Sequence, residues 1–140
     1  MTVSILRSAG AVVAALIVAL VLVVAVELVG AAVHPPPEDF DGTPEAMHAY
    51  VANYPGWILA FVVLIWGGTT FLSTWLATRL GTNRHPAHGL AVGLFLFAAV
   101  LFNMSKLPYP IWFEVLNLVA FPIGIYFGVK LGRGPRVRME

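Results

Sequence analysis

The sequence contains no cysteine and few charged residues. The absence of cysteine excludes disulfides, thiolate metal sites and cysteine nucleophiles. Only 11% of the 140 residues are charged and 59% are hydrophobic, whereas about 25% are charged in a typical soluble domain. The net charge of +1 comes from basic residues that are spread along the chain, so no nucleic-acid partner is indicated. This composition predicts a membrane protein with a single domain, residues 1–140.

Four apolar runs follow one another, each close to the roughly 20 residues that a membrane-spanning helix needs. They predict helices over about residues 5–33, 56–80, 88–105 and 111–131. The expected fold is all-α: four transmembrane helices in an antiparallel up-down bundle, because the connections between them are short. The first run begins near the basic Arg7 and ends on small residues, which leaves a cleaved signal peptide as an alternative interpretation.

Basic residues mark one side of these spans, and cytoplasmic segments are the ones that retain Lys and Arg. Seven of the eight Lys and Arg residues fall on the same side of the pattern: Arg7, Arg79, Arg84, Lys130, Arg133, Arg136 and Arg138. Lys106 alone falls on the other side. We therefore expect both termini in the cytoplasm, with the 34–55 loop and the 106–110 turn outside.

The external loop contains a helix signal. Thr43-Pro44-Glu45 supplies an N-cap, a proline at the first helical position and an acid in the first turn. This predicts a short interfacial helix over about residues 44–53, which lies on the membrane surface or caps the bundle. Two near copies, Tyr54-Pro55-Gly56-Trp57 and Tyr109-Pro110-Ile111-Trp112, open the second and fourth spans. Two explanations are open. One is internal duplication, and the other is convergence, because the start of any inward-running span favours proline and an interface tryptophan.

Small residues at four-residue spacing predict where the helices pack, since close backbone approach holds membrane helices together. The fourth span carries Gly124, Gly128 and Gly132. The first span carries a row at Ala11, Ala15, Ala19, Val23 and Glu27, which predicts that Glu27 points into the bundle. These faces pack within one chain or between copies in a homo-oligomer. Membrane lipids and another membrane protein are the other expected partners.

Polar residues in and just beyond the outer half of the spans are the strongest functional lead. The candidate cluster is Glu27, His34, Trp66, Asn103, Lys106, Glu114 and Asn117. An ionisable group inside a membrane is costly and is usually functional. One interpretation is an outward-facing pocket that binds a proton, a cation or a polar head group. The other is structural: hydrogen bonds among Glu27, Asn103 and Asn117 fix the helix order, and Lys106 pairs with Glu114 at the surface.

No pattern indicates catalysis. Neither a nucleophile with its base nor a phosphate-binding loop is visible, and the histidines lack the spacing of a metal site. We therefore predict no catalytic residue, no metal and no cofactor, and we expect that the protein is not an enzyme.

Three motifs resemble those of a widespread group of small bacterial four-span membrane proteins: Glu27-Leu28-Val29-Gly30, His34-Pro35-Pro36-Pro37, and Asn103 followed by Leu107-Pro108-Tyr109-Pro110-Ile111-Trp112-Phe113. The resemblance covers nearly the whole chain. It implies a multi-pass protein of the bacterial plasma (inner) membrane and brings no activity with it. Small multidrug transporters also have four helices and a glutamate in the first, but theirs is central, whereas Glu27 lies in the outer third.

The expected function is therefore that of a non-enzymatic membrane protein whose outward-facing polar cluster binds a small ligand or contacts a partner. The alternative is a small homo-oligomeric carrier of a proton-coupled or cationic solute. A carrier needs an ionisable group that can be reached from both sides in turn. The inner half of the spans has none before Arg79 and Lys130, which counts against transport.

Overall fold

The computed structural model describes residues 2–134, and within this range the chain is helical and has no strand. The elements are α1 (Thr2–Val33), α2 (Pro44–Ala52), α3 (Gly56–Leu80), the short 3-10 turn η1 (Thr82–Arg84), α4 (Pro86–Lys106) and α5 (Ile111–Arg133). Four of these helices, α1, α3, α4 and α5, are long and apolar enough to cross a membrane. The four predicted helices are thus confirmed. Two arginines of the predicted charge bias, Arg136 and Arg138, lie outside the described residues.

Local signals set the helix ends. The Thr43 side chain accepts a hydrogen bond from the Ala46 amide at 3.2 Å, so the predicted cap of α2 is confirmed, and this helix ends one residue earlier than expected. Helix α4 begins at Pro86, two residues earlier than predicted. The reason is a second cap, because the His85 Nδ1 accepts a hydrogen bond from the Ala87 amide at 3.2 Å.

Helix α1 begins three residues before the predicted start, because polar side chains tie its first turns to the end of α3 and to η1. The Arg7 Nε donates to the Leu80 carbonyl at 2.9 Å, and the Ser8 hydroxyl donates to the Thr82 hydroxyl at 3.0 Å. The Thr82 hydroxyl in turn donates to the Ser4 carbonyl at 2.8 Å. These bonds provide the polar partners that keep this part of α1 helical and in place.

Helices α3 and α5 pack with their backbones close together. A Cβ atom placed on Gly124, Gly128 or Gly132 would lie 2.9, 2.5 or 2.9 Å from a backbone oxygen of α3. Side chains do not fit at such distances, so glycine is required there. The facing row on α3 consists of buried threonines whose hydroxyls donate to the carbonyl four residues earlier: Thr70, Thr74 and Thr78. This glycine row is therefore used within the chain.

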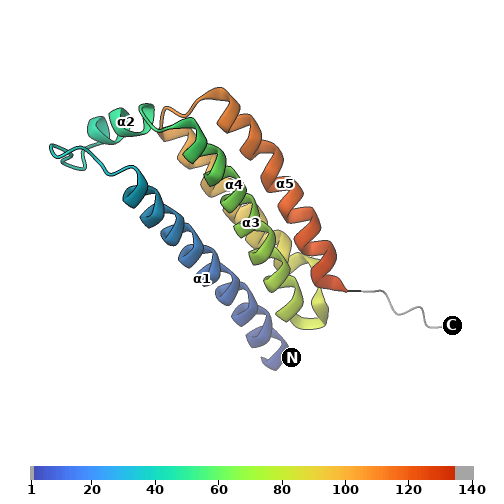
Figure 1. Cartoon of the computed structure of the whole chain (residues 1–140). Helices are drawn as coiled ribbons and strands as arrows, with labels where there is room; N and C mark the ends of the chain where they lie inside the picture. Colours follow the sequence, from blue (N-terminus) through green and yellow to red (C-terminus); the bar gives the residue numbers. More distant parts are fainter. Residues whose placement is uncertain (1, 135–140) are drawn as a thin grey trace.

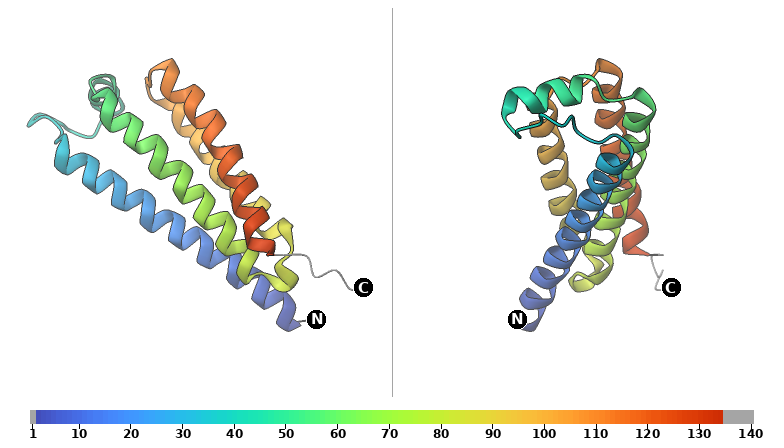
Figure 2. Two further views of the ribbon diagram at one scale, coloured as in Figure 1. Left: turned by 45° about the vertical axis from the view of Figure 1, so that its right-hand side comes forward. Right: turned by 60° about the vertical axis from the view of Figure 1, so that its left-hand side comes forward.

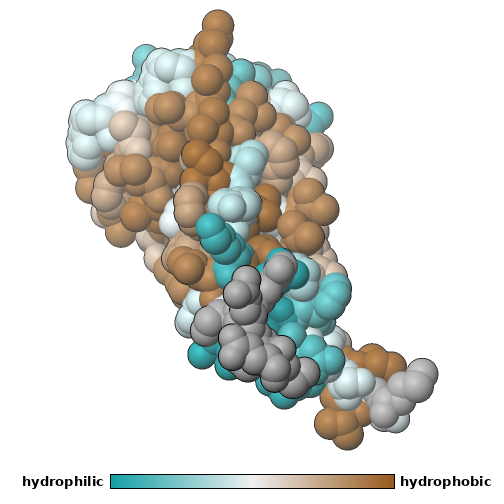
Figure 3. Space-filling model, turned by 90° about the vertical axis from the view of Figure 1, so that its right-hand side faces the viewer, coloured by the Kyte–Doolittle hydropathy of each residue, from teal (hydrophilic) through white to brown (hydrophobic). Residues whose placement is uncertain are grey.

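Helix α1 lies against α3 and α4 and diverges from α3 toward the end of the molecule that α2 crosses, which we call the α2 end (Figure 1 and Figure 2). At that end α1 contacts the connection between α2 and α3, because a Cβ on Gly30 would lie 2.7 Å from the Tyr54 hydroxyl. Apolar side chains cover the middle of the face shown in Figure 3, and hydrophilic residues gather toward both ends. Helix α1 thus packs against α3 through small residues such as Ala15, lies farther from it toward the α2 end, and contacts the connection between α2 and α3 there.

Candidate functional site

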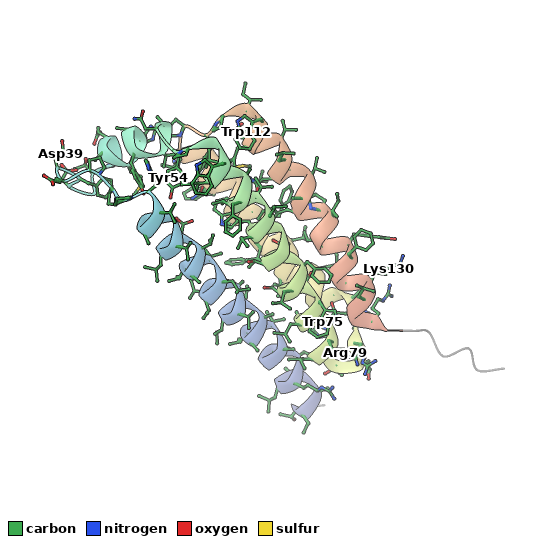
Figure 4. All side chains as sticks on the ribbon, viewed as in Figure 1. Asp39, Tyr54, Trp75, Arg79, Trp112 and Lys130 are labelled. Atoms are coloured by element: carbon green, nitrogen blue, oxygen red, sulfur yellow. The ribbon has the colours of Figure 1, made fainter. Side chains whose placement is uncertain are left out.

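A cavity of about 250 Å³ lies at the α2 end, beneath α2 and between α1 and α3. We call it the Glu27 cavity. Every long helix except α5 contributes to its wall, as do α2, the α2–α3 connection and the α4–α5 connection. The side chains that matter below are Glu27, Tyr50, Tyr54, Trp66, Asn103 and Tyr109. Figure 4 shows Tyr54 at this end, close to where α1 and α3 diverge. Pockets for drug-sized ligands measure roughly 300–1,000 Å³, so this volume suits a smaller molecule.

Three polar groups on the wall have no partner among the described residues. The Glu27 carboxylate makes neither a hydrogen bond nor an ion pair, and its side chain is exposed. The Trp66 Nε1 donor and the Asn103 Oδ1 acceptor are buried without a hydrogen bond. Buried polar atoms of this kind normally bond to water or to a ligand. The cavity is therefore bordered by a negative charge, and an unpartnered acceptor and an unpartnered donor are buried in its wall.

Aromatic rings form the rest of the polar wall. Burial raises the pKa of the Tyr109 phenol to about 12, and the charge of Glu27 adds to the shift. The pKa of Tyr54 is also raised, first by burial, then by a hydrogen bond with the Tyr50 side chain, and further by the charges of Tyr50 and Glu27. Both phenols therefore lie within electrostatic reach of the carboxylate. Ring faces attract cations, and Trp and Tyr do so most strongly.

His34 contacts Tyr50 and Tyr54 but does not line the Glu27 cavity. Its ring stacks on Tyr50 with centroids 5.3 Å apart and meets Tyr54 edge-on at 5.1 Å. Its carbonyl accepts a hydrogen bond from the Tyr50 hydroxyl. His34 lines a separate cavity of about 420 Å³ under the loop that precedes α2. His34 therefore does not lie in one cluster with Glu27, as predicted. It contacts tyrosines that line the Glu27 cavity.

The prediction that Glu27 points into the bundle holds in part: Glu27 lines the cavity between α1 and α3, but it is exposed, whereas Ala11, Ala15 and Ala19 are buried. A four-residue step advances about 40° around a helix of 3.6 residues per turn. Four such steps from Ala11 carry the row about 160° around α1. The buried face instead continues at Val26 and Gly30. Glu27 therefore sits beside that face, where it reaches the cavity from its rim.

The structural interpretation of the cluster does not hold within residues 2–134. The Asn117 amide donates to the Phe113 carbonyl of its own helix at 3.0 Å, and its oxygen has no partner. The Lys106 ammonium lies 5.4 Å from the centre of the Phe102 ring and forms no ion pair with Glu114 or Glu27. The structure thus brings together Glu27, Trp66 and Asn103, and it leaves Lys106, Glu114 and Asn117 outside the cavity wall.

A second cavity, of about 200 Å³, adjoins the first and shares Trp66 and Asn103 with it. Its other lining residues come from α1, α3, α4 and α5, among them Val23, Leu96 and Phe121. None of its lining residues is ionisable. Trp66 and Asn103 therefore separate a charged cavity at the α2 end from an uncharged space that lies deeper among the helices.

Sequence reasoning missed the tyrosines of the site. In the sequence, Tyr50, Tyr54 and Tyr109 are indistinguishable from the interface aromatics that membrane proteins place near the headgroups. The repeated Tyr-Pro motif was a usable signal: Tyr54 and Tyr109 hold equivalent positions before α3 and α5, and both line the Glu27 cavity. The two near copies thus bring their tyrosines to one site.

No protein-family model matches the chain, and no curated protein or solved structure is significantly similar to it. The resemblance to small four-span bacterial proteins therefore stays a prediction.

Proposed function

We propose that the protein is a non-enzymatic, multi-pass protein of the bacterial plasma membrane that binds a small organic cation in the Glu27 cavity. In this proposal α1, α3, α4 and α5 form an antiparallel up-down bundle, and α2 lies on the outer surface. The ligand class is an alkylammonium, a positively charged nitrogen with a small apolar substituent. The site is open to the outside of the cell.

The observation that carries the proposal is an unpaired carboxylate beside aromatic rings. Glu27 supplies the negative charge, and Tyr54, Tyr109 and Trp66 supply ring surface on the same cavity wall. An ammonium satisfies all of them at once, through Coulomb attraction and cation–π contact. The unpartnered Asn103 Oδ1 provides an acceptor for an N–H or O–H of the ligand. An anion would meet the Glu27 charge without a cation on the cavity wall to offset it.

The orientation rests on the basic residues. Arg7, Arg79, Arg84, Lys130 and Arg133 occupy the end opposite α2, and cytoplasmic segments retain such residues. The resemblance stated above supports a bacterial plasma membrane. Both termini are then cytoplasmic, and the Glu27 cavity faces outward.

Binding is a better account than transport. A carrier has to release its ligand on both sides, and its ionisable group has to be reached from each in turn. Glu27 is the only ionisable residue within the apolar part of α1, and the deeper cavity that shares Trp66 with the site has none. A carrier also predicts a homo-oligomer, whereas the glycine row of α5 is occupied by α3 of the same chain.

Isothermal titration calorimetry on the full chain in phosphatidylcholine nanodiscs tests the proposal. The probes are choline and its uncharged isostere 3,3-dimethyl-1-butanol. We expect choline to bind at least about tenfold more tightly, which corresponds to about 1.4 kcal/mol. Glu27→Gln should abolish this preference. Glu45→Gln is the matched control, because Glu45 is an exposed carboxylate on α2 that does not line the cavity.

Two results would overturn the proposal. One is equal affinity for choline and its isostere, or no binding of either. The other is a preference for choline that survives Glu27→Gln, because the charge that carries the argument would then be dispensable. Repeating the titration with ethanolamine in place of choline shows whether the site prefers a primary or a quaternary ammonium.

A further inference from the structure

A basic pocket of about 680 Å³ lies at the end opposite α2, between the start of α4 and the end of α5. Three cationic side chains line it: Arg84, Lys130 and Arg133. Its apolar wall includes Leu90 and Val129. Figure 4 shows Arg79 and Lys130 together at this end, with Asp39 at the other. The pocket shares no residue with the Glu27 cavity.

Among residues 2–134, positive charges converge here without a carboxylate to balance them. A Cβ on Gly134 would lie 3.1 Å from the Arg84 Nη1 and 3.6 Å from the Arg79 Nη1, so two guanidinium groups approach one point. The acidic residues of the described range all belong to the α2 half of the molecule: Glu27, Glu38, Asp39, Asp41, Glu45 and Glu114. Like charges held this close repel one another unless an anion neutralises them.

The backbone holds Arg84 in the pocket by an uncommon conformation. Asn83 and Arg84 both have positive φ values, 54° and 48°, a region that non-glycine residues rarely occupy. Two such residues in succession are costly, and strain of this kind is concentrated at binding sites. The amino-terminal end of α4, which also borders the pocket, adds partial positive charge.

The apolar side of the pocket continues onto the exposed surface of the helices. Leu90 lines the pocket and is exposed, and Leu94 is exposed one turn further along α4. On α5, Tyr126 and Ile123 are exposed in the same way, and the Lys130 ammonium lies 5.4 Å from the centre of the Tyr126 ring. A free anion would make no favourable contact with such a surface, whereas the acyl chains of a lipid would pack against it.

We propose that the basic pocket binds the phosphate of an anionic phospholipid, with the acyl chains along the exposed apolar side chains of α4 and α5. Arg84, Lys130 and Arg133 surround the head group, and basic pockets between helix ends on the cytoplasmic side are suited to such lipids. The proposal is independent of the ligand in the Glu27 cavity. It assigns this end of the molecule to a leaflet that contains anionic lipid.

The test uses the full chain in a neutral detergent and measures lipid binding by native mass spectrometry. We expect phosphatidylglycerol to bind at least about tenfold more tightly than phosphatidylcholine. Lys130→Gln should weaken phosphatidylglycerol binding about fivefold, the contribution of one charge near a membrane surface. Lys106→Gln is a matched control, since the Lys106 ammonium also lies 5.4 Å from a ring centre but at the α2 end. It should change the affinity less than twofold.

Three results would overturn the proposal. Equal retention of the two lipids would show that the charge cluster does not select an anionic head group. An equal effect of Lys106→Gln and Lys130→Gln would show that net charge acts and the pocket does not. Displacement of phosphatidylglycerol by millimolar inorganic phosphate would show that the site takes free anions without help from the apolar surface. Lys130 is exposed, so Lys130→Gln is expected to fold like the parent.

Discussion

Glu27 is an acidic side chain in the apolar part of α1, and it has no partner within the described residues. Placing a charge in such a segment is unfavourable by a few kcal/mol, so a residue of this kind is retained for what it does. A structural role would require bonds to neighbouring helices, but the Asn117 amide donates to the Phe113 carbonyl of its own helix, and no hydrogen bond joins Asn103 to Glu27 within the described residues. The unpaired charge therefore favours a binding role.

Replacing Glu27 by leucine tests this assignment. We expect Glu27→Leu to be at least as stable as the parent, because the change removes a charge and breaks no hydrogen bond. Thermal unfolding in detergent, followed by circular dichroism, measures the effect. A loss of more than about 2 kcal/mol would mean that Glu27 bonds to other helices after all, since that is the size of a broken buried polar contact.

Tyr109 gives a pH-dependent readout of the same site. Its pKa of about 12 in the folded protein exceeds the ordinary value of 10.0, so the folded state holds the phenolic proton more tightly. The resulting stabilisation is complete below about pH 10 and is lost as the pH rises toward 12. Spectrophotometric titration at 295 nm, compared with Tyr109→Phe, isolates this phenol. Glu27→Gln should lower the pKa of Tyr109; an unchanged value would place the carboxylate out of reach.

Sequence alone identified three residues of the site, Glu27, Trp66 and Asn103, because polar or bulky amphipathic groups stand out in apolar runs. It could not identify their contacts. Whether Lys106 turns to a carboxylate or to the Phe102 ring depends on side-chain geometry that no spacing determines. The tyrosines were hidden for another reason, since an interface aromatic and a cavity aromatic look alike in a sequence.

At the scale of the helices, α3 and α5 depend on close backbone contact. The glycines of α5 meet backbone oxygens and threonine side chains of α3, at the hydroxyl of Thr74 and at carbon atoms of Thr70 and Thr78. Each of these hydroxyls already bonds within its own helix. The threonine side chains therefore cannot move aside freely. Van der Waals contact of this kind replaces the hydrophobic effect, which is absent between helices in lipid.

Gly128→Ala should destabilise the protein by about 1–3 kcal/mol, the usual effect of overpacking. The added Cβ would lie 2.5 Å from the Phe71 carbonyl and 3.0 Å from the Trp75 amide. Gly68→Ala is the control, since a Cβ there has no atom within 4 Å, and we expect a change of less than about 1 kcal/mol. Unfolding in detergent compares the two. Equal stabilities would show that α3 and α5 do not meet at Gly128.

Helix positions were largely predictable from the sequence, because apolar runs, prolines and caps act locally. Helix α2 begins at Pro44, directly after its cap Thr43. Helices α3 and α5 begin directly after Pro55 and Pro110. The choice of packing partner was not predictable, since all four long helices carry small residues. The small-residue row of α1 misled for a further reason: a four-residue repeat does not stay on one face of a 3.6-residue helix, and the row winds away from its neighbour.

On the scale of the whole molecule, charge is divided between the two ends. The acidic residues of the described range lie toward α2, and every basic one except Lys106 lies toward the opposite end. We propose a cation site at the first end and an anionic lipid site at the second. The proposed cation site lies where α1 diverges from α3. This divergence could not be inferred from the sequence, because it depends on contacts at both ends of α1.

The proposed orientation predicts a simple labelling pattern. The chain has no cysteine, so a single introduced cysteine reports alone. A membrane-impermeant maleimide added to intact cells should label Thr43→Cys in the loop before α2 and should spare Thr82→Cys in η1, because the positive-inside rule places the latter in the cytoplasm. Permeabilised cells provide the control for reactivity. Labelling of Thr82→Cys alone in intact cells would reverse the orientation.

The cation site itself is tested most directly by the charge preference of a cysteine inside the cavity. Met47 lines the Glu27 cavity. Met47→Cys can be modified in intact cells with either of two methanethiosulfonate reagents of similar size, one carrying a trimethylammonium and the other a sulfonate. We expect the cationic reagent to be favoured, and we expect Glu27→Gln to reduce the cation-to-anion rate ratio about fivefold, as one charge worth about 1 kcal/mol would do. An unchanged ratio in Glu27→Gln, or no reaction from outside, would contradict a cation-binding cavity that is open to the cell exterior.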